Sequence, residues 1–418
     1  INDQYNTLKE KLSKLGLRVY RVVGVDKDNT SMIKERRTLN KAIDKGEVDL
    51  LLTTPEFLEY HIEKIKKLNP GFLVADEVHN MASSSKMFRE TYTRLDELKE
   101  ELGNPLTMGA TATADTETAR LVTNKLDIKP SNIVIDKKAR NNLNIVDERG
   151  IRKHKKINYV KDLLEKEEKT IVYIHSREKS MNYANELRFM SEKFKEQVAF
   201  YHSGMSKAEK EEVEKQFKKG DIKLVFSTSS LGEGVDLEDI RHIVHWHLPF
   251  NHIAFNQKSG RAGRDGNEAY IHLLYNSKDA SSNEYILNNI TPAKPLLAEL
   301  YSVLKEFADD KNIITADNFQ LMDNVNVKFN EDNLNDEGVQ SGLNIFEELG
   351  FIEIEENPNR EIKLIPQEKQ TQIEESIRFK EGMQDKLAFQ KFKNFALNGD
   401  KGELLEKINK PIYPKESL

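Results

Sequence analysis

The sequence predicts an α/β protein with parallel sheets covered by helices on both faces, followed by a smaller α+β part. Two observations indicate the sheets: short apolar segments recur along the chain, and charged amphipathic stretches separate them. A third observation marks their limit, because the alternation stops near Ser277, where Asn, Asp and Glu become frequent. We therefore expect three domains, over residues 1–138, 139–288 and 289–418.

In the first domain, short apolar segments have the composition of strands buried on both faces. These strands are expected over residues 18–23, 50–53, 72–75 and 106–109. Helices are expected between them, over residues 5–15, 57–67 and 86–101. This order favours a parallel sheet.

The second domain follows a polar segment, residues 129–156, that we interpret as a linker. Strands are expected over residues 170–174, 198–201, 224–227, 242–246 and 270–274. Apolar residues at helical spacing predict helices over 179–194 and 207–218. The pattern repeats that of the first domain and predicts a second parallel sheet.

The third domain has a different pattern. Helices are expected over residues 296–308 and 340–349, the latter ended by Gly350. A hairpin over 351–355 and 361–364 follows, and helix, turn and hairpin together resemble a winged helix. The tail, residues 367–410, is expected to be mostly charged helix.

The composition limits the function classes. Charged residues make up 32% of the 418 residues, yet the net charge is only -6, so a nucleic-acid surface would have to be a local groove. The absence of cysteine excludes disulfides and thiolate zinc sites, and it fits a reducing compartment. No apolar run approaches the roughly 20 residues of a membrane span, so we expect no membrane partner.

Two adjacent carboxylates, Asp76 and Glu77, follow the predicted strand 72–75. Ligands of open parallel sheets bind at the carboxyl ends of strands. Asp76 would hold Mg²⁺ through its water shell, and Glu77 would orient and deprotonate an attacking water. His79 would connect this pocket to the hydroxyls of residues 111–113. The alternative is an ordinary acidic pair that caps a helix.

The segment 257–266 carries two arginines, Arg261 and Arg264, between glycines. Such arginines can neutralise charge on a transferring phosphoryl group. The alternative is a surface pair that forms salt bridges. A second glycine-rich segment contains Gly234, which permits close backbone approach, and Asp236, which would contact ribose, metal-bound water or an arginine. That segment could equally be a connecting loop.

A further set of residues would bind the phosphate backbone of a nucleic acid. Thr54 caps a predicted helix directly after a strand, and helix N-termini bind phosphates. Ser176 and Arg177, His202, and Thr228 each follow another predicted strand. Each is an ordinary cap or turn by itself, but their shared position at strand ends predicts one nucleic-acid-binding face.

The order of these motifs resembles that of superfamily 2 helicases, and most of all the RecQ family. The matching segments, in family order, are residues 76–79, 111–113, 201–204, 231–236 and 257–266. The resemblance extends over about residues 1–277 and implies two RecA-like lobes that bind ATP and Mg²⁺. It gives Gln257, together with Asp76, Glu77, Arg261 and Arg264, a catalytic role.

Residues 3–4 resemble the end of the family's motif Ia, and residues 54–56 resemble motif Ib. Phe88 and Arg89 lie in a segment that resembles the aromatic-rich loop, which implies contact with single-stranded DNA. The implied activity is ATP-dependent 3′–5′ DNA unwinding in repair or recombination, on single-stranded and duplex DNA, by a cytoplasmic, nucleoid-associated protein. An RNA helicase, a duplex translocase and a non-catalytic scaffold remain as alternatives.

The sequence departs from the family in specific ways. No Gly-Lys-Ser/Thr phosphate loop occurs, and the chain begins with Ile1, so we expect a first lobe lacking its start and a chain inactive alone. The single tryptophan, Trp246, is not in the aromatic-rich segment, and the family's cysteine zinc module is absent. Residues 343–352 and the tail resemble the terminal domain of RecJ exonucleases, which implies a RecJ-like nuclease region as partner. The scaffold alternative would instead have the C-terminal module dock a partner such as single-strand-binding protein.

Overall fold

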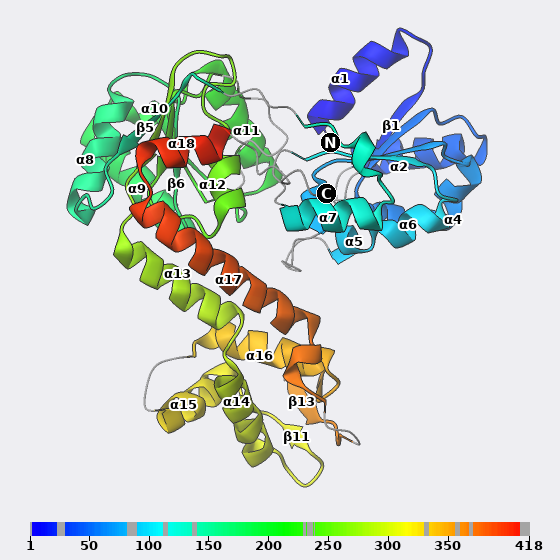
Figure 1. Ribbon diagram of the computed structural model, residues 1–418, viewed down its shortest axis with the longest axis vertical. Helices are drawn as coiled ribbons and strands as arrows, with labels where there is room; N and C mark the ends of the chain where they lie inside the picture. The colour runs from blue at the N-terminus through cyan, green and yellow to red at the C-terminus, as the bar shows by residue number, and fades with distance from the viewer. Residues whose placement is uncertain are drawn as a thin grey trace. The chain divides into compact units, whose positions relative to one another are not determined.

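The structure, a computed structural model, describes residues 2–22, 30–81, 90–111, 116–135, 140–228, 231, 237, 239–329, 334–355, 360–367 and 371–409. The chain forms two compact units (Figure 1). The described residues of the first unit lie within 2–81, 90–276 and 398–409, and those of the second lie within 277–397. The first unit holds two α/β lobes, which we call lobe 1 and lobe 2.

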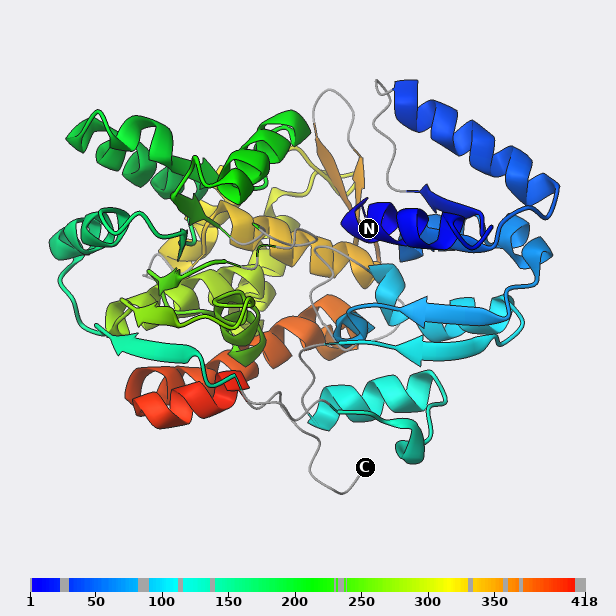
Figure 2. The same ribbon diagram turned by 90° about the horizontal axis from the view of Figure 1, so that it is seen from above.

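Lobe 1 contains two parallel strand pairs. β1 (Val19–Val22) pairs with β2 (Leu50–Thr53), and β3 (Phe72–Ala75) pairs with β4 (Leu106–Gly109). Figure 2 shows β3 and β4 as adjacent parallel arrows. The helices are α1 (Asn2–Ser13), α2 (Thr30–Asp44), α3 (Pro55–Tyr60), α4 (Ile62–Ile65), α5 (Glu90–Thr93), α6 (Leu95–Glu101) and α7 (Thr116–Lys125), with 3₁₀ turns at η1 (Lys66–Leu68), η2 (Val78–Met81) and η3 (Pro130–Asn132).

The described residues cover only one of the two faces of the β3–β4 pair. Alternate strand residues point to the same face, and on one face Phe72 and Val74 are 54% and 56% exposed. Leu106 and Met108, which lie opposite them, are 73% and 51% exposed. The other face packs on a core that includes Leu98 and other apolar residues of α3, α6 and α7.

Lobe 2 is built on a six-stranded sheet, and every strand pairing in it is parallel. The strand order is β5 (Leu143–Asp147), β10 (Ala269–Leu273), β9 (His242–His245), β6 (Thr170–Tyr173), β8 (Leu224–Ser227) and β7 (Val198–Tyr201). Its helices are α8 (Lys153–Leu164), α9 (Arg177–Met190), α10 (Phe194–Gln197), α11 (Lys207–Lys219) and α12 (His252–Ser259). All residues of β6, β8 and β9 are buried, as expected for a sheet covered on both faces.

Several sequence expectations need correction. The segment 129–156 is not only a linker, because it contains β5 and the start of α8. The helix expected over 57–67 is divided among α3, α4 and η1, since His61 has a non-helical backbone. The expected strands over 50–53, 72–75, 106–109, 198–201 and 224–227 are confirmed residue for residue.

The second unit contains a helix–strand–helix–helix–hairpin order, which is that of a winged helix. After α13 (Ser277–Ile290), the elements are α14 (Lys294–Phe307), β11 (Ile313–Ile314), α15 (Asn318–Phe329), α16 (Asp336–Glu348), β12 (Ile352–Glu355) and β13 (Glu361–Leu364). The three strands form an antiparallel sheet in the order β11-β13-β12. Leu300, Leu343 and Phe346 are buried in its core.

The expected helical tail is divided. After η4 (Ile373–Glu375), α17 (Ile377–Asn398) lies along α13, where Lys393 pairs with Glu284 at 2.7 Å. The chain then breaks before α18 (Lys401–Asn409), which belongs to the first unit and packs on β5 and α12 (Figure 1). The C-terminal part expected over 289–418 is therefore not one compact body. None of the described helices is long and apolar enough to cross a membrane.

Candidate active site at the strand ends

The two carboxylates of lobe 1 lie directly after β3, as the sequence predicts. Asp76 accepts a hydrogen bond from the backbone N–H of Glu77 at 2.9 Å and one from the side-chain amide of Gln4 at 2.9 Å. Glu77 has φ of +52°, a left-handed conformation that non-glycine residues seldom adopt. The next residues form the 3₁₀ turn η2, so the pair does not open an α-helix. Both carboxylates are exposed.

His79 connects three parts of the first unit. Its Nδ1 lies 2.8 Å from the hydroxyl of Thr111 and 3.2 Å from a carboxylate oxygen of Glu77. Its Nε2 lies 3.3 Å from the amide nitrogen of Gln257, a residue of lobe 2. Because an amide N–H only donates, His79 Nε2 accepts, and the proton of the neutral ring is then on Nδ1, facing the two oxygens.

The backbone holds this loop against the end of β4. Ala110 N–H donates to Ala75 at 2.8 Å, and Val78 N–H donates to Ala110 at 3.0 Å. A side chain at Gly109 would come within 3.2 Å of Val78, so the close approach requires glycine or a shift of Val78. The Tyr92 hydroxyl donates to the Asp76 carbonyl at 3.1 Å. Thr111 is thereby placed next to His79, whereas Thr113 lies outside the described residues.

The arginine segment forms a turn after α12. Arg140 donates to the carbonyl of Gly260 at 2.8 Å and also to that of Ala262, and Asn142 donates to the carbonyl of Gly263 at 2.7 Å. Gly263 has φ of +54°, and an added Cβ would come within 2.6 Å of Asn142. The turn is therefore fixed from the segment that precedes β5.

Electrostatics around this turn are dominated by arginines. Burial lowers the pKa of Arg140, and the positive charge of Arg264 lowers it further. Arg264 is exposed and Arg261 is half-buried, while Asp265 in the same turn pairs with Arg241. Arg264 and the partly buried Arg140 thus lie close to each other, and two like charges favour an anion at this place.

The residues predicted to grip phosphates are helix caps and strand ends in the structure. Thr54 caps α3 by accepting from Phe57 N–H at 3.3 Å, and Ser176 caps α9 by accepting from Lys179 N–H at 3.2 Å. Thr228 follows β8, and its N–H donates to Tyr201 at 3.2 Å. The lobe 2 residues thus lie at the carboxyl ends of adjacent parallel strands.

His202 is the least ordinary of this set. It is 7% exposed, yet neither ring nitrogen has a hydrogen-bond partner within the described structure. Burial lowers its pKa, and the nearby charge of Arg177 adds to the effect. A buried ring without partners beside an arginine suits a ligand that supplies both an acceptor and negative charge. Phe88, Arg89, Gly234 and Asp236 lie outside the described residues.

Sequence reasoning missed three residues that position the site: Gln4, as a partner of Asp76, and Arg140 and Asn142, as supports of the arginine turn. Arg140 and Asn142 lie in the polar segment that we interpreted as a linker. The pattern of Leu143 and Ile145, two apolar residues separated by one polar residue, is the signal that could have identified an adjacent strand.

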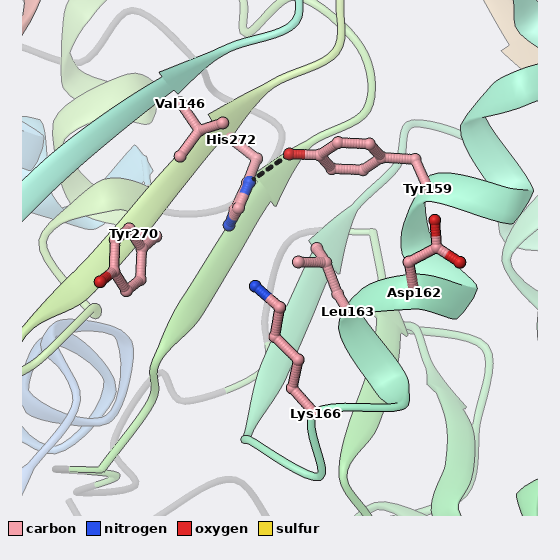
Figure 3. Close-up of a pocket in the computed structure, with 7 residues that line it drawn as sticks. All are labelled: Val146, Tyr159, Asp162, Leu163, Lys166, Tyr270 and His272. Carbon is pink, nitrogen blue, oxygen red and sulfur yellow. Dashed lines mark hydrogen bonds between the residues drawn. The ribbon is translucent and has the colours of Figure 1, made fainter.

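Lobe 2 also has a cavity of about 350 Å³ away from these residues (Figure 3). It is lined by Val146, Tyr159, Asp162, Leu163, Lys166, Tyr270 and His272. The Tyr159 hydroxyl lies 2.7 Å from His272 Nδ1, and His272 Nε2 lies 2.9 Å from His242 Nδ1. His242 Nε2 in turn lies 2.8 Å from Glu168. None of the predicted site residues lines this cavity.

Comparison with known proteins agrees with this arrangement. Residues 1–122 match the DEAD/DEAH box helicase family, and residues 155–266 match the helicase conserved C-terminal domain. The chain therefore contains segments that match these two helicase domains. The resemblance to superfamily 2 helicases is confirmed.

Several curated relatives are DNA helicases of the RecQ and RecS type. The chain is 31% identical to the probable ATP-dependent DNA helicase RecS of Bacillus subtilis, over 61% of this chain and 52% of RecS. It is 26% identical to the ATP-dependent DNA helicase RecQ of Haemophilus influenzae, over 69% of this chain and 47% of that protein. The chain thus spans about half the length of these relatives.

A solved structure supports the fold alone. The helicase Lhr of Mycobacterium smegmatis, bound to single-stranded DNA and AMP-PNP, aligns with a TM-score of 0.53 at 18% identity. The alignment covers 87% of this chain and 51% of Lhr. The predicted α/β fold with two RecA-like lobes is confirmed.

Proposed function

We propose that this chain is the motor part of an ATP-dependent, RecQ-like DNA helicase that moves 3′ to 5′ on single-stranded DNA. The contact between Gln257 and His79 carries the proposal, because it joins the carboxylate loop of lobe 1 to the helix that precedes the arginine turn of lobe 2. A helicase that couples ATP hydrolysis to movement along DNA needs such a contact between its two lobes.

The residues suit ATP hydrolysis in distinct roles. Asp76 presents oxygens, the ligands that Mg²⁺ prefers, and Mg²⁺ bound through water would neutralise phosphate charge. Glu77, which is exposed and near the His79 ring, would orient and deprotonate the attacking water. Arg261 and Arg264 would stabilise negative charge on the transferred phosphoryl group. Gln257, which lies on the preceding helix, would connect their turn to lobe 1 through its contact with His79. Gly234 and Asp236 would contact the nucleotide.

DNA would be held mainly through its phosphates. Thr54 in lobe 1 and Ser176, Arg177, His202 and Thr228 in lobe 2 supply hydroxyl, guanidinium and imidazole groups at strand ends, and Phe88 and Arg89 would add contacts from the aromatic-rich segment. Binding of this kind weakens steeply with salt. The biological setting that we propose is repair or recombination, with single-strand-binding protein or a RecJ-like nuclease as partner.

A phosphate loop is the part that these residues do not contain. No Gly-Lys-Ser/Thr sequence occurs in the chain, and we propose that hydrolysis depends on such a loop in the active protein. An RNA helicase or duplex translocase would use the same lobes, so ATPase stimulation by single-stranded DNA, duplex DNA and RNA, measured side by side, discriminates among them. A scaffold would bind DNA without any stimulated hydrolysis.

Replacing the general base tests the catalytic assignment. In the protein that carries both these residues and a phosphate loop, Glu77→Gln is expected to lower DNA-stimulated turnover by about 10²–10⁴-fold while ATP and DNA affinities stay within twofold. Glu63→Gln, at an exposed glutamate of α4, is the matched control and should leave turnover unchanged. Turnover of Glu77→Gln equal to that of the unaltered protein would contradict the proposed function.

A further inference from the structure

Lobe 2 has a second group of basic residues at its strand ends that the proposed mechanism does not use. His175 follows β6, His247 follows β9, and these two strands are neighbours in the sheet. Lys258 comes from α12, one residue after Gln257. We call His175, His247 and Lys258 the histidine–lysine cluster. All three residues are half-buried.

The geometry of the cluster is fixed by ring contacts. The rings of His175 and His247 stack with centroids 5.0 Å apart and planes 26° apart. The ring of Phe250 stacks on His175 at 4.9 Å and 21°. The backbone N–H of His175 donates to His247 Nδ1 at 3.3 Å, so the neutral His247 ring carries its proton on Nε2. The strands thus present two oriented imidazoles together.

Among the described residues, the lysine of the cluster has no acidic partner. Within the described residues, Lys258 forms no hydrogen bond or ion pair, and its Nζ atom lies 5.1 Å from the centroid of the Tyr173 ring. An ammonium group that loses water without gaining a carboxylate is costly. Burial accordingly lowers the pKa of Lys258 to about 8.

The surroundings of the cluster are cationic on each side. Burial and then Lys258 and Lys179 lower the pKa of His175 to about 3. Burial and then His175, Lys156, Lys179 and Lys258 lower the pKa of His247 to about 2. The remaining titratable neighbours are Tyr173 of β6 and His245 of β9, whose Nε2 lies 2.9 Å from the Ser259 hydroxyl. Within the described part of the chain, no carboxylate influences the pKa values of His175, His245, His247 and Lys258.

We propose that the histidine–lysine cluster is a phosphate-binding site of lobe 2, separate from the arginine turn and from the capping residue Ser176. A phosphate would accept from the Lys258 ammonium and from the imidazole N–H groups, and its charge would replace the missing carboxylate. The phosphate could belong to a bound nucleic-acid strand or be free inorganic phosphate. The first source rests on the proposed function, whereas the second does not.

Phosphate binding at this site is expected to take up protons. The imidazoles are neutral at pH 7 in the free protein, and a nearby anion favours their charged forms. Compared with a Lys258→Arg variant, affinity for phosphate should therefore fall as pH rises through the range near 8 in which Lys258 loses its proton.

The first experiment uses inorganic phosphate alone. We expect the imidazole NMR signals of His175 and His247, assigned with His175→Asn and His247→Asn, to shift when phosphate replaces chloride at constant ionic strength. Lys258→Met should abolish the shifts, and Lys258→Arg, which keeps the charge, should retain them. Unchanged His175 and His247 signals in the unaltered protein would overturn the proposal, whether or not DNA binds.

The second experiment identifies the source of the phosphate. The salt dependence of single-stranded DNA binding should decrease in slope by about 0.7 in Lys258→Met if one strand phosphate is lost. Lys215→Met, at an exposed lysine of α11, is the control and should keep the full slope. An unchanged slope with intact phosphate-dependent NMR shifts would assign the site to free phosphate. Failure of the unaltered protein to bind DNA would contradict the proposed function. The first experiment would still test whether the cluster binds phosphate, because it uses no DNA.

Discussion

Lobe 1 and lobe 2 use similar four-residue apolar strands in different surroundings. In lobe 2, β6, β8 and β9 are buried along their whole length. In lobe 1, β3 and β4 have alternate residues that are more than half exposed, although β3 leads directly to Asp76 and Glu77. Strand composition thus indicates the capacity for burial, while the neighbouring elements decide whether burial occurs.

The largest predicted difference is in the cost of removing a strand leucine. Leu224 and Leu106 are both the first residues of strands, but Leu224 is 0% exposed and Leu106 is 73% exposed. Leu224→Ala should destabilise lobe 2 by about 3 kcal/mol, because it removes buried methyl groups and leaves a cavity. Leu106→Ala should change stability by less than about 0.5 kcal/mol, as surface substitutions usually do.

The single tryptophan makes this measurement specific for lobe 2. Trp246 is 2% exposed and packs against Tyr183 with ring centroids 4.7 Å apart, so its fluorescence in urea follows unfolding of lobe 2. Hydrogen exchange of β3 and β4 amides would follow lobe 1 in the same protein. Equal losses for the two leucine variants would show that the β3–β4 face is covered in solution, and the contrast between the lobes would disappear.

The sequence predicted the parts of the fold that depend on local pattern. The strands around Phe72 and Leu224 were found because apolar composition and length are local properties. β5 was missed because it is an edge strand in which Asn144 is exposed, so a polar segment concealed it. The return of α18 to lobe 2 was also missed, because packing of Leu404 depends on tertiary structure and leaves no local signal.

The candidate site was predictable as a set of residues but not as a geometry. Asp76, Glu77 and Arg264 were identified from motif order. The left-handed backbone of Glu77 and the support of the arginine turn by Arg140 required the structure, because both arise from contacts between distant segments. The histidine–lysine cluster likewise brings together residues that follow different strands, and no spacing rule connects them.

The second-largest predicted effect, after that of Leu224→Ala, is the destabilisation of lobe 2 at acidic pH. Burial and the charge of His242 lower the pKa of His272 to about 3, whereas an unfolded histidine titrates near 6.5. The folded ring stays neutral while the unfolded ring gains a proton, so stability is full above pH 6.5 and is lost as pH falls toward 3. Between pH 7 and pH 5 the loss for His272 alone should be on the order of 2 kcal/mol.

Trp246 fluorescence in urea at pH 7 and pH 5 measures this loss. His272→Gln removes the titrating ring, so we expect it to lower stability at pH 7 but to flatten the dependence on pH. Lobe 1, where His61 has a pKa lowered by burial and by Arg36, should respond less, because fewer of its histidines are buried among the described residues. A lobe 2 that is equally stable at the two pH values would contradict this prediction.

The smallest predicted effects concern helix caps, and they separate structural from functional roles. Ser176 caps α9 and Ser206 caps α11, each by accepting a backbone N–H from the third residue of its helix. Replacement of either by alanine should destabilise lobe 2 by about 1 kcal/mol. Thr54→Ala removes the corresponding cap of α3 in lobe 1 and should leave the Trp246 transition unchanged.

DNA affinity then distinguishes the two serines. If Ser176 donates its hydroxyl to a phosphate, Ser176→Ala should weaken single-stranded DNA binding by roughly 3- to 10-fold, which is the loss of one hydrogen bond. Ser206→Ala carries a similar loss of stability, so any affinity change caused by loosening of lobe 2 should occur in both variants. Equal affinities in the two would leave Ser176 as a cap and nothing more. A loss confined to Ser176→Ala indicates direct contact, because both substitutions remove the cap of a lobe 2 helix.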